Sequence, residues 1–431
     1  MRIKLAYGRE GLWIDLPDDA PVTVIEPRFV PGLPDERVAI VQALRAPRDT
    51  PPLRDLAGPD DTVAIVFSDL TRPMPNDRAL PPLLDELAAA GVPAEQVVLI
   101  NALATHRPQT EAELRGMLGD GIVDRYRVIQ HDARSDDDNL VPVATNHAGR
   151  PVRVHRAYVE ASVRILTGFI EPHFFAGFSG GPKAVLPGIA DAEAILDNHG
   201  PDMIAHPGAT WAVTGGNPIW EEMLKVALAT QPSVVLNVTL NQRRQITGVF
   251  AGDLQAAHRA GAEFVRGTAL QPLAEPFDVV ITSNSGYPLD LNLYQAVKGM
   301  SAAAGIVRPG GDIVVAAECW DGIPDHGEYK RLLWAADSPQ DLLETVMVPG
   351  FRCQDQWEAQ IQAQIQLKAR VHVFAGGLSD EELRRALVIP CRSVEETVAR
   401  IRQDNPAATV AVLPDGPQTV PYVRGGEERA L

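Results

Sequence analysis

Along most of the chain, short apolar runs alternate with longer stretches in which apolar residues recur at helical spacing. The short runs predict buried strands within Val63–Phe67, Val97–Ile100, Arg125–His131, Val152–Gly168, Val279–Thr282, Ile313–Ala317, Val371–Phe374 and Val410–Leu413. The helical spacing predicts helices within Leu80–Ala90, Glu111–Leu118, Ala192–Leu196, Leu254–Val265, Leu293–Gly305, Glu328–Met347, Gln354–Lys368, Asp380–Leu387 and Val394–Arg402. A hairpin is predicted from Ile3 to Leu16, and a β-ribbon from Val234 to Val249. Because this alternation is typical of parallel sheets covered by helices, it predicts an α/β fold.

The alternation is interrupted once, at Gln271–Pro276, where two prolines predict that no regular element forms. We therefore expect two lobes, residues 1–273 and 274–431, each with a mainly parallel sheet flanked by helices. An active-site cleft is expected between them. The tail from Gly416 onward is polar and is predicted to be loose.

Composition and charge narrow the possible partners. The 431 residues are 45% hydrophobic and 22% charged, as in ordinary globular proteins. No apolar run approaches the roughly 20 residues that cross a bilayer, so we expect no membrane partner. The net charge of −17, without a clustered basic face, excludes a nucleic acid partner.

Two further features indicate the compartment. The N-terminus has no apolar block after its basic residues, which predicts that the chain carries no secretory signal and is cytoplasmic. The cysteines at positions 319, 353 and 391 are far apart in the sequence. We expect them to be reduced structural thiols rather than metal ligands.

Two polar clusters directly follow predicted strands, where ligands bind in open α/β sheets. Ser68–Pro73 contains Asp69, which can accept hydrogen bonds from sugar hydroxyls, and Arg72, which can hold a carboxylate with two parallel bonds. Asn101–Pro108 contains His106, a candidate general acid or base. The alternatives are a capped turn with a surface ion pair and a solvated or helix-capping histidine.

The third cluster, Gly168–Lys183, has four glycines and two prolines in sixteen residues, which predicts a tightly folded loop. Phenylalanines around His173 would keep its imidazole partly dry. Lys183 lies at P-loop distance, but Pro182 and Ala184 replace residues that a P-loop requires, so we reject that interpretation. Lys183 is instead a candidate nucleophile. The alternative is a glycine-rich turn with a surface lysine.

The last two clusters lie on helices. His199, in Asp197–Gly200, is either a helix cap or a metal ligand whose partner donors come from something other than protein. Tyr294, Gln295 and Lys298 can share one side of a helix, where an amide and an ammonium suit an anionic substrate. That side can also be simply the solvated face. The other histidines are interpreted as structural: His131, His147, His155, His206, His258, His326 and His372.

Taken together, the motifs SDLTRP, THRP, EPHFFAGFSGGPK, DNHG and YQAVKG resemble, in this order, the signature of the nickel-pincer lactate racemase family. The resemblance implies a racemase or epimerase of small 2-hydroxy acids. It also implies the nickel-pincer nucleotide, pyridinium-3-thioamide-5-thiocarboxylic acid mononucleotide, which holds Ni²⁺ through sulfur, ring carbon and sulfur. Cofactor maturation proteins are the implied partners.

The resemblance assigns a role to each candidate residue. Lys183 matches the lysine that joins the cofactor through a thioamide, and Asp69 matches a cofactor contact. His199 matches the protein ligand that completes a square-planar nickel site. His106 and His173 match the two acid/base histidines. The groups that match substrate-orienting residues, or lie beside them, are Arg72, Tyr294, Gln295 and Lys298.

The implied chemistry is reversible hydride removal from C2 as the hydroxyl proton leaves. This gives a neutral ketone, and bases on opposite sides let either enantiomer react. Several alternatives remain: a sugar-acid 2-epimerase of the same family, a non-catalytic cofactor-binding protein, and a cofactor held noncovalently because Pro182 precedes Lys183. An NAD-dependent oxidoreductase would need a Gly-x-Gly-x-x-Gly turn, which Ser68–Arg72 does not offer. The particular 2-hydroxy acid is left open.

Overall fold

The computed structural model describes residues 1–17, 20–136, 138–325 and 327–424. His326, interpreted above as structural, lies outside the described residues. The chain forms two compact units, which are described separately. Unit 1 comprises Met1–Arg28, His199–Pro207 and Ala269–Leu431, and unit 2 comprises Phe29–Asn198 and Gly208–Thr268.

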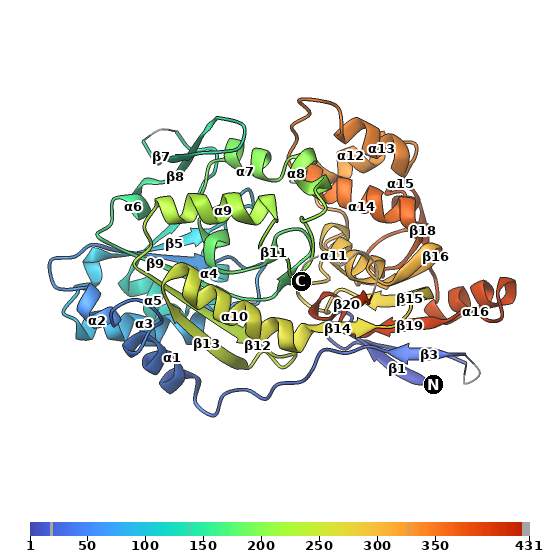
Figure 1. Cartoon of the computed structure of the whole chain (residues 1–431), viewed down its shortest axis with the longest axis horizontal. Coiled ribbons are helices and arrows are strands. Elements are labelled where there is room, and N and C mark those ends of the chain that lie inside the picture. Colours follow the sequence, from blue (N-terminus) through green and yellow to red (C-terminus); the bar gives the residue numbers. More distant parts are fainter. Residues whose placement is uncertain (18–19, 137, 326, 425–431) are drawn as a thin grey trace. The chain divides into compact units, whose positions relative to one another are not determined.

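Unit 2 is built on a six-stranded sheet in the order β13-β12-β9-β4-β5-β6 (Figure 1). Its strands are β4 Val63–Ser68, β5 Val97–Ala102, β6 Arg127–Gln130, β9 Val163–Phe169, β12 Val234–Leu240 and β13 Ile246–Gly252. Neighbouring strands run parallel except for β12 and β13, which form the predicted ribbon. Two short antiparallel pairs accompany the sheet: β7 Leu140–Thr145 with β8 Pro151–His155, and β10 Pro172–His173 with β11 Gly177–Phe178.

Helices connect these strands. They are α1 Glu36–Arg45, α2 Leu53–Leu56, α3 Asn76–Ala89, α4 Glu111–Leu118, α5 Asp120–Arg125, α6 Arg156–Val159, α7 Ala192–Asn198, α9 Pro218–Ala229 and α10 Leu254–Ala269, with 3₁₀ turns η1 Ala94–Gln96 and η2 Gly181–Ala184. The sequence predicts α4 at the observed residues. A capping box explains its start, because Thr110 and Glu113 bond each other's backbone N–H groups.

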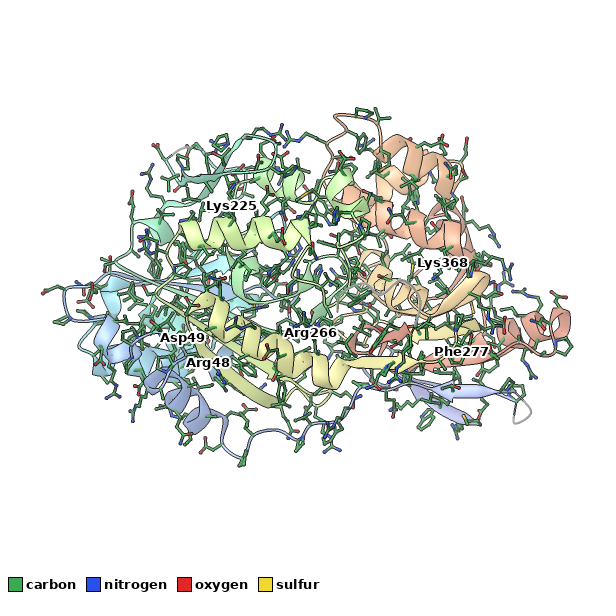
Figure 2. All side chains as sticks on the ribbon, in the orientation of Figure 1. Arg48, Asp49, Lys225, Arg266, Phe277 and Lys368 are labelled. Atoms are coloured by element: carbon green, nitrogen blue, oxygen red, sulfur yellow. The ribbon has the colours of Figure 1, made fainter. Side chains whose placement is uncertain are left out.

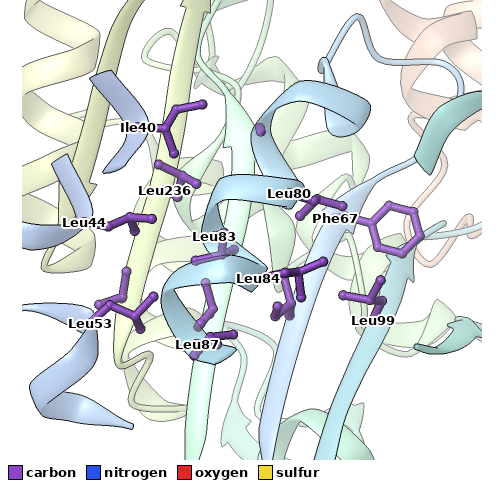
Figure 3. Close-up of a cluster of buried hydrophobic side chains, with 14 of the residues drawn as sticks. Ile40, Leu44, Leu53, Phe67, Leu80, Leu83, Leu84, Leu87, Leu99 and Leu236 are labelled. Carbon is purple, nitrogen blue, oxygen red and sulfur yellow. The ribbon is translucent and has the colours of Figure 1, made fainter. Parts of the chain in front are cut away.

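The core of unit 2 shows why α3 forms. Leu80, Leu83, Leu84 and Leu87 recur at helical spacing and are buried on one face of this helix. They pack with apolar residues of α1 and of the sheet strands, including Leu236 (Figure 3). Burial of each such side chain contributes about 1.5–3 kcal/mol, so this face holds the helix against the sheet.

Unit 1 contains a second six-stranded sheet, in the order β18-β17-β16-β15-β19-β3, with every neighbouring pair parallel. Its strands are β3 Val22–Val24, β15 Phe277–Ser283, β16 Val307–Ala316, β17 Arg370–Phe374, β18 Ile389–Pro390 and β19 Val410–Leu413. The predicted hairpin is present as β1 Arg2–Leu5 and β2 Leu12–Asp15, and its apolar side packs on this sheet. The prediction of an α/β fold with two mainly parallel sheets is confirmed.

The helices of unit 1 are α8 Pro201–Ala205, α11 Leu293–Ala304, α12 Tyr329–Ala335, α13 Pro339–Val346, α14 Gln356–Lys368, α15 Asp380–Arg385 and α16 Val394–Asp404, with the 3₁₀ turn η3 Gly416–Gln418. The α8 segment belongs to this unit because it contacts α14, where the Gln360 side chain donates to the Pro201 carbonyl at 3.0 Å. Among the residues that the structure describes, no helix is long and apolar enough to cross a membrane.

Two details of the sequence interpretation are wrong. Strand β14, Leu270–Leu273, runs through the segment where prolines were expected to prevent regular structure. It pairs in parallel with β20, Val420–Val423, in the tail that was expected to be loose. Both strands belong to a two-stranded sheet. Pro272 fits there because each strand has one edge without a partner, where a missing N–H removes no ladder bond.

Candidate active site

Three neighbouring strands of the unit 2 sheet end in the loops that carry predicted site residues. Asp69 and Arg72 follow β4, His106 follows β5, and the loop with His173 and Lys183 follows β9. Because parallel strands end at the same edge of a sheet, these three loops leave the sheet from one edge.

Asp69 and His106 form a hydrogen-bonded pair. Their Oδ2 and Nδ1 atoms are 2.7 Å apart, and Asp69 is buried. The Thr71 hydroxyl donates to the other carboxylate oxygen at 2.9 Å. A carboxylate only accepts, so His106 donates from Nδ1, and the neutral ring keeps Nε2 as its basic atom. Asp69 therefore sets the tautomer of His106.

The Asp69 carboxyl is held in its ionised form. Burial by itself raises its pKa, but the charge and hydrogen bond of His106, together with Arg72 and Thr71, outweigh burial and keep the pKa below its ordinary value. The pair is therefore suited to accept a proton at Nε2.

His173 lies in the β10–β11 hairpin and is surrounded by aromatic rings. Its ring stacks on Phe174 at 4.9 Å between centroids and meets the edge of Phe175 at 4.5 Å. The backbone N–H of Ala176 donates to Nδ1 at 3.3 Å. In the neutral ring the proton then sits on Nε2, the opposite arrangement from His106. The two histidines therefore differ in the ring nitrogen that carries the proton: Nδ1 in His106 and Nε2 in His173.

The loop that carries His173 is tightly folded, as predicted. Gly177 has a φ of +75°, and a Cβ there would lie 2.1 Å from the Val213 carbonyl oxygen. The Gly181 N–H donates to the Asn237 side chain at 2.9 Å. Only glycine fits such a close approach, so these glycines set the shape of the loop.

Two polar side chains of α10, the buried His258 and the partly buried Arg266, support the same loop. His258 donates from Nε2 to the Ser179 carbonyl at 2.9 Å, and burial lowers its pKa to about 4, so the ring is neutral at neutral pH. Arg266 lies on the same helix (Figure 2). Its guanidinium lies 5.0 Å from the ring centroid of Phe178 and donates to the Ala212 carbonyl at 2.7 Å. Both side chains pack against the loop from the same helix.

Lys183 lies in the short 3₁₀ turn η2 and is only partly buried. Its Nζ lies 5.5 Å from the ring centroid of Phe175, the same ring that meets His173. The structure therefore brings both Lys183 and His173 into contact with the same aromatic ring, that of Phe175. A cation beside an aromatic face is favourable and is partly screened from water.

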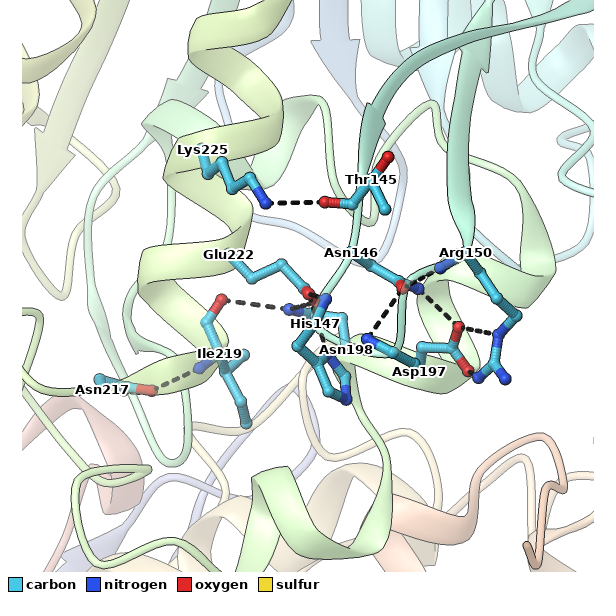
Figure 4. A network of polar contacts seen from close by, with 11 residues as sticks. Thr145, Asn146, His147, Arg150, Asp197, Asn198, Asn217, Ile219, Glu222 and Lys225 are labelled. Carbon is cyan, nitrogen blue, oxygen red and sulfur yellow. Dashed lines mark hydrogen bonds and ion pairs between the residues drawn. The ribbon is translucent and has the colours of Figure 1, made fainter.

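A buried polar network fixes the end of α7. Asp197 accepts hydrogen bonds from Asn146 at 2.6 Å and from the Arg150 guanidinium, and Asn198 donates to Glu222 at 2.9 Å (Figure 4). Both acceptor carboxylates are buried, so losing a partner would leave a buried charge uncompensated. The network therefore defines where the chain leaves α7, directly before the predicted nickel ligand.

His199, the predicted nickel ligand, belongs to unit 1 and is 3% exposed. Its ring contacts the edge of Trp357, with 5.1 Å between centroids. The indole Nε1–H of Trp357 donates to the Tyr294 hydroxyl at 2.9 Å. One tryptophan thus links the predicted metal ligand to a predicted substrate residue. Trp357 is not among the site residues that the sequence predicts.

The other predicted substrate residues lie at the start of α11. Asn292 caps this helix by accepting from the Gln295 N–H at 3.1 Å. The Lys298 ammonium donates to the Gln295 side-chain oxygen at 2.7 Å, so the amide and the ammonium share one side of the helix, as predicted. This bond leaves the Gln295 amide group oriented with its NH₂ away from the lysine.

Comparisons with known proteins agree over nearly the whole chain. Residues 7–212 match the lactate racemase N-terminal domain, and residues 273–420 match the lactate racemase C-terminal domain. The lactate racemase of Thermoanaerobacterium thermosaccharolyticum is 36% identical over 421 residues, which are 96% of this chain and 97% of that protein. The lactate racemase of Lactiplantibacillus plantarum is 35% identical over 384 residues, 88% of this chain and 90% of that protein.

Solved structures show the same relationship. The lactate racemase apoprotein from T. thermosaccharolyticum matches with a TM-score of 0.90 and 34% identity, covering 98% of this chain and all 100% of that one. A Thermotoga maritima protein matches with a TM-score of 0.68, covering 92% of this chain and 100% of its own, but at 17% identity it shows the fold alone. The chain therefore belongs to the lactate racemase family, a family of isomerases.

Proposed function

We propose that this protein inverts C2 of a small 2-hydroxy acid, using a nickel-pincer nucleotide and two histidines as acid and base. The observation that carries the proposal is the pair of His106 and the buried Asp69, joined at 2.7 Å. This pair prepares a base at Nε2. Both curated relatives are named for lactate, so a short 2-hydroxy acid is the substrate that we propose.

The residues present fit the proposed cofactor. Among the described residues, no group of three or more His, Cys, Asp and Glu side chains lies where it could hold a metal ion. A metal would therefore need further donors from outside the protein. This suits a nucleotide that would bring its own sulfur and carbon donors, while the protein would add one imidazole, that of His199. Lys183 would hold the nucleotide through its amine. When bound, the nucleotide supplies an acceptor and donor of hydride.

The protein's own part of the reaction is proton transfer. His106 takes the hydroxyl proton at Nε2, and Asp69 stabilises the imidazolium that results. His173 returns a proton to the oxygen when the flat 2-keto acid presents its other face. At each stage of the proposed reaction only one of the two rings carries the additional proton, so one ring is charged while the other is neutral. Reaction from the opposite enantiomer uses the same steps in reverse.

The remaining residues are proposed to orient the substrate and exclude water. A guanidinium can hold a carboxylate with two parallel bonds, the role proposed for Arg72. An ammonium and an amide complement the carboxylate and hydroxyl, the role proposed for the α11 residues Tyr294, Gln295 and Lys298. The buried rings of Phe174 and Phe175 keep water away from His173.

The proposal is tested on protein matured with the cofactor-assembly proteins. Nickel per chain and intact mass are measured first, and then racemisation of lactate and of related 2-hydroxy acids from each enantiomer. We expect one nickel per chain, an added mass at Lys183, and interconversion of both enantiomers. His106→Ala and His173→Ala should each abolish activity at unchanged nickel content. Full activity in either variant would refute the assigned roles.

A further inference from the structure

A polar cavity lies in unit 1, at the edge of the sheet away from α11. It measures about 500 Å³ and is lined at the amino ends of β15, β16 and β17 and at the end of α16. The α11 helix, with the proposed substrate residues, follows the carboxyl end of β15. The cavity is therefore separate from those residues. Its charged lining groups are Asp278, Arg308, Asp312, Arg370, His372, Arg400 and Asp404.

Two of the lining carboxylates, Asp312 and Asp278, already accept several hydrogen bonds from other side chains and from the backbone. Asp312 accepts from Arg370 at 2.8 and 2.6 Å and from Nε2 of His372 at 2.8 Å. Asp278 accepts from Arg308 at 2.7 Å, and from Thr409 through both its backbone N–H and its hydroxyl at 2.8 Å. These oxygens have little capacity left for a ligand that donates hydrogen bonds.

The donors, by contrast, are not used up. A guanidinium has five N–H donors, and the bonds above use one on Arg308 and two on Arg370. Arg400 is exposed and forms no hydrogen bond or ion pair with any described residue. His372 adds no donor to these, because it donates from Nε2 to Asp312 and its buried Nδ1 is then the acceptor of the neutral ring.

The charged groups around the cavity that remain unbonded also favour a ligand that accepts hydrogen bonds. The lining sets three guanidiniums, of Arg308, Arg370 and Arg400, against three carboxylates, but two of these carboxylates already accept from protein donors, which within the described part of the chain leaves only Asp404 with unbonded oxygens. In a chain with a net charge of −17, this is a local concentration of unused positive donors.

We propose that this cavity binds a small anion through carboxylate or phosphate oxygens, with the three guanidiniums as donors. A guanidinium matches both kinds of oxygen, because its parallel N–H groups fit two oxygens at once. The site is distinct from the proposed substrate residues and does not depend on the bound nickel cofactor.

The test is calorimetric titration of the full chain with inorganic phosphate and, separately, with malonate; the two arms distinguish phosphate from carboxylate binding. Arg400→Gln removes an unbonded exposed guanidinium and should weaken binding about tenfold, the worth of a charged hydrogen bond. Arg259→Gln, an equally exposed arginine on α10, is the matched control and should bind like the wild type.

The substrate residues require their own control, because they also attract anions. Lys298→Gln should leave binding at the cavity unchanged. The proposal is overturned if neither anion binds, if Arg400→Gln and Arg259→Gln bind equally well, or if Lys298→Gln abolishes the binding. Melting midpoints of the unliganded variants confirm that each one is folded.

Discussion

Replacing Asp69 by Asn tests the acid/base pair with little change in volume. The variant loses the charge that His106 faces at 2.7 Å, and it keeps only one of the two oxygens that accept from His106 and from the Thr71 hydroxyl at 2.9 Å. A hydrogen bond to a charged group is worth about 1.5–3 kcal/mol. If that amount is lost when His106 becomes imidazolium, kcat falls about 10- to 150-fold, since 1.36 kcal/mol is tenfold in rate.

The assay is racemisation by protein of known nickel content, with rates expressed per nickel so that cofactor loading does not enter the comparison. Thr71→Val is the matched control. It removes the hydroxyl that donates to the other oxygen of the same carboxylate, and it leaves the charge beside His106 in place. We expect the kcat of this control to fall by less than that of Asp69→Asn.

An unchanged kcat in Asp69→Asn, with nickel content and fold intact, would show that Asp69 does not act through His106. A fall in nickel content with normal kcat per nickel would instead favour the cofactor contact that the family resemblance implies for Asp69. The two roles therefore give different results in the same preparation.

Three further changes test the fold and the site. Glu86→Gln should lower the free energy of unfolding by about 1–3 kcal/mol at neutral pH. Hydrogen bonds from Arg45 and Arg54 lower the pKa of Glu86 below its ordinary value of 4.5, so this contribution is lost as the pH falls through the pKa of the folded state. Urea titrations of the variant and the wild type should therefore converge in acid. Gly177→Ala places a Cβ 2.1 Å from a carbonyl oxygen and should cost about 2–4 kcal/mol in thermal unfolding, whereas Gly149→Ala, with a similar φ of +74° and open space, should cost about 1 kcal/mol. Trp357→Phe keeps a ring but loses the bond to Tyr294, and steady-state kinetics should show KM about fivefold higher with kcat little changed.

Much of the fold follows from local patterns in the sequence. The strands of both sheets are short apolar runs, and α4 begins at a capping box that is visible in the sequence. The β14–β20 pair was missed because it joins segments about 150 residues apart, and no local pattern encodes such a pairing. Helix α9 was also missed, although Asn217 and Pro218 carry the start signal of a helix.

The candidate site also has features that the sequence predicts and features that it does not. Strand ends predict that Asp69 and His106 leave the sheet at one edge, because β4 and β5 are neighbours. The hydrogen bond between them depends on side-chain geometry that spacing does not define. Trp357 gave no signal, since it lies 63 positions after Tyr294 in a helix whose buried face also contains glutamines.

The equilibrium constant of the reaction separates a racemase from an epimerase, even though the two histidines differ. Enantiomers have equal free energies, so the equilibrium constant of a racemisation is one and kcat/KM must be equal in the two directions, whichever histidine is damaged. Asp69→Asn disturbs only the His106 side of the site, yet it must lower both values of kcat/KM by the same factor. For a sugar acid with other stereocentres the two forms differ in free energy, and the two values differ from each other in wild type and variant alike. A ratio of one in both proteins therefore identifies the product as an enantiomer, and any other ratio contradicts the proposed racemisation of a short 2-hydroxy acid.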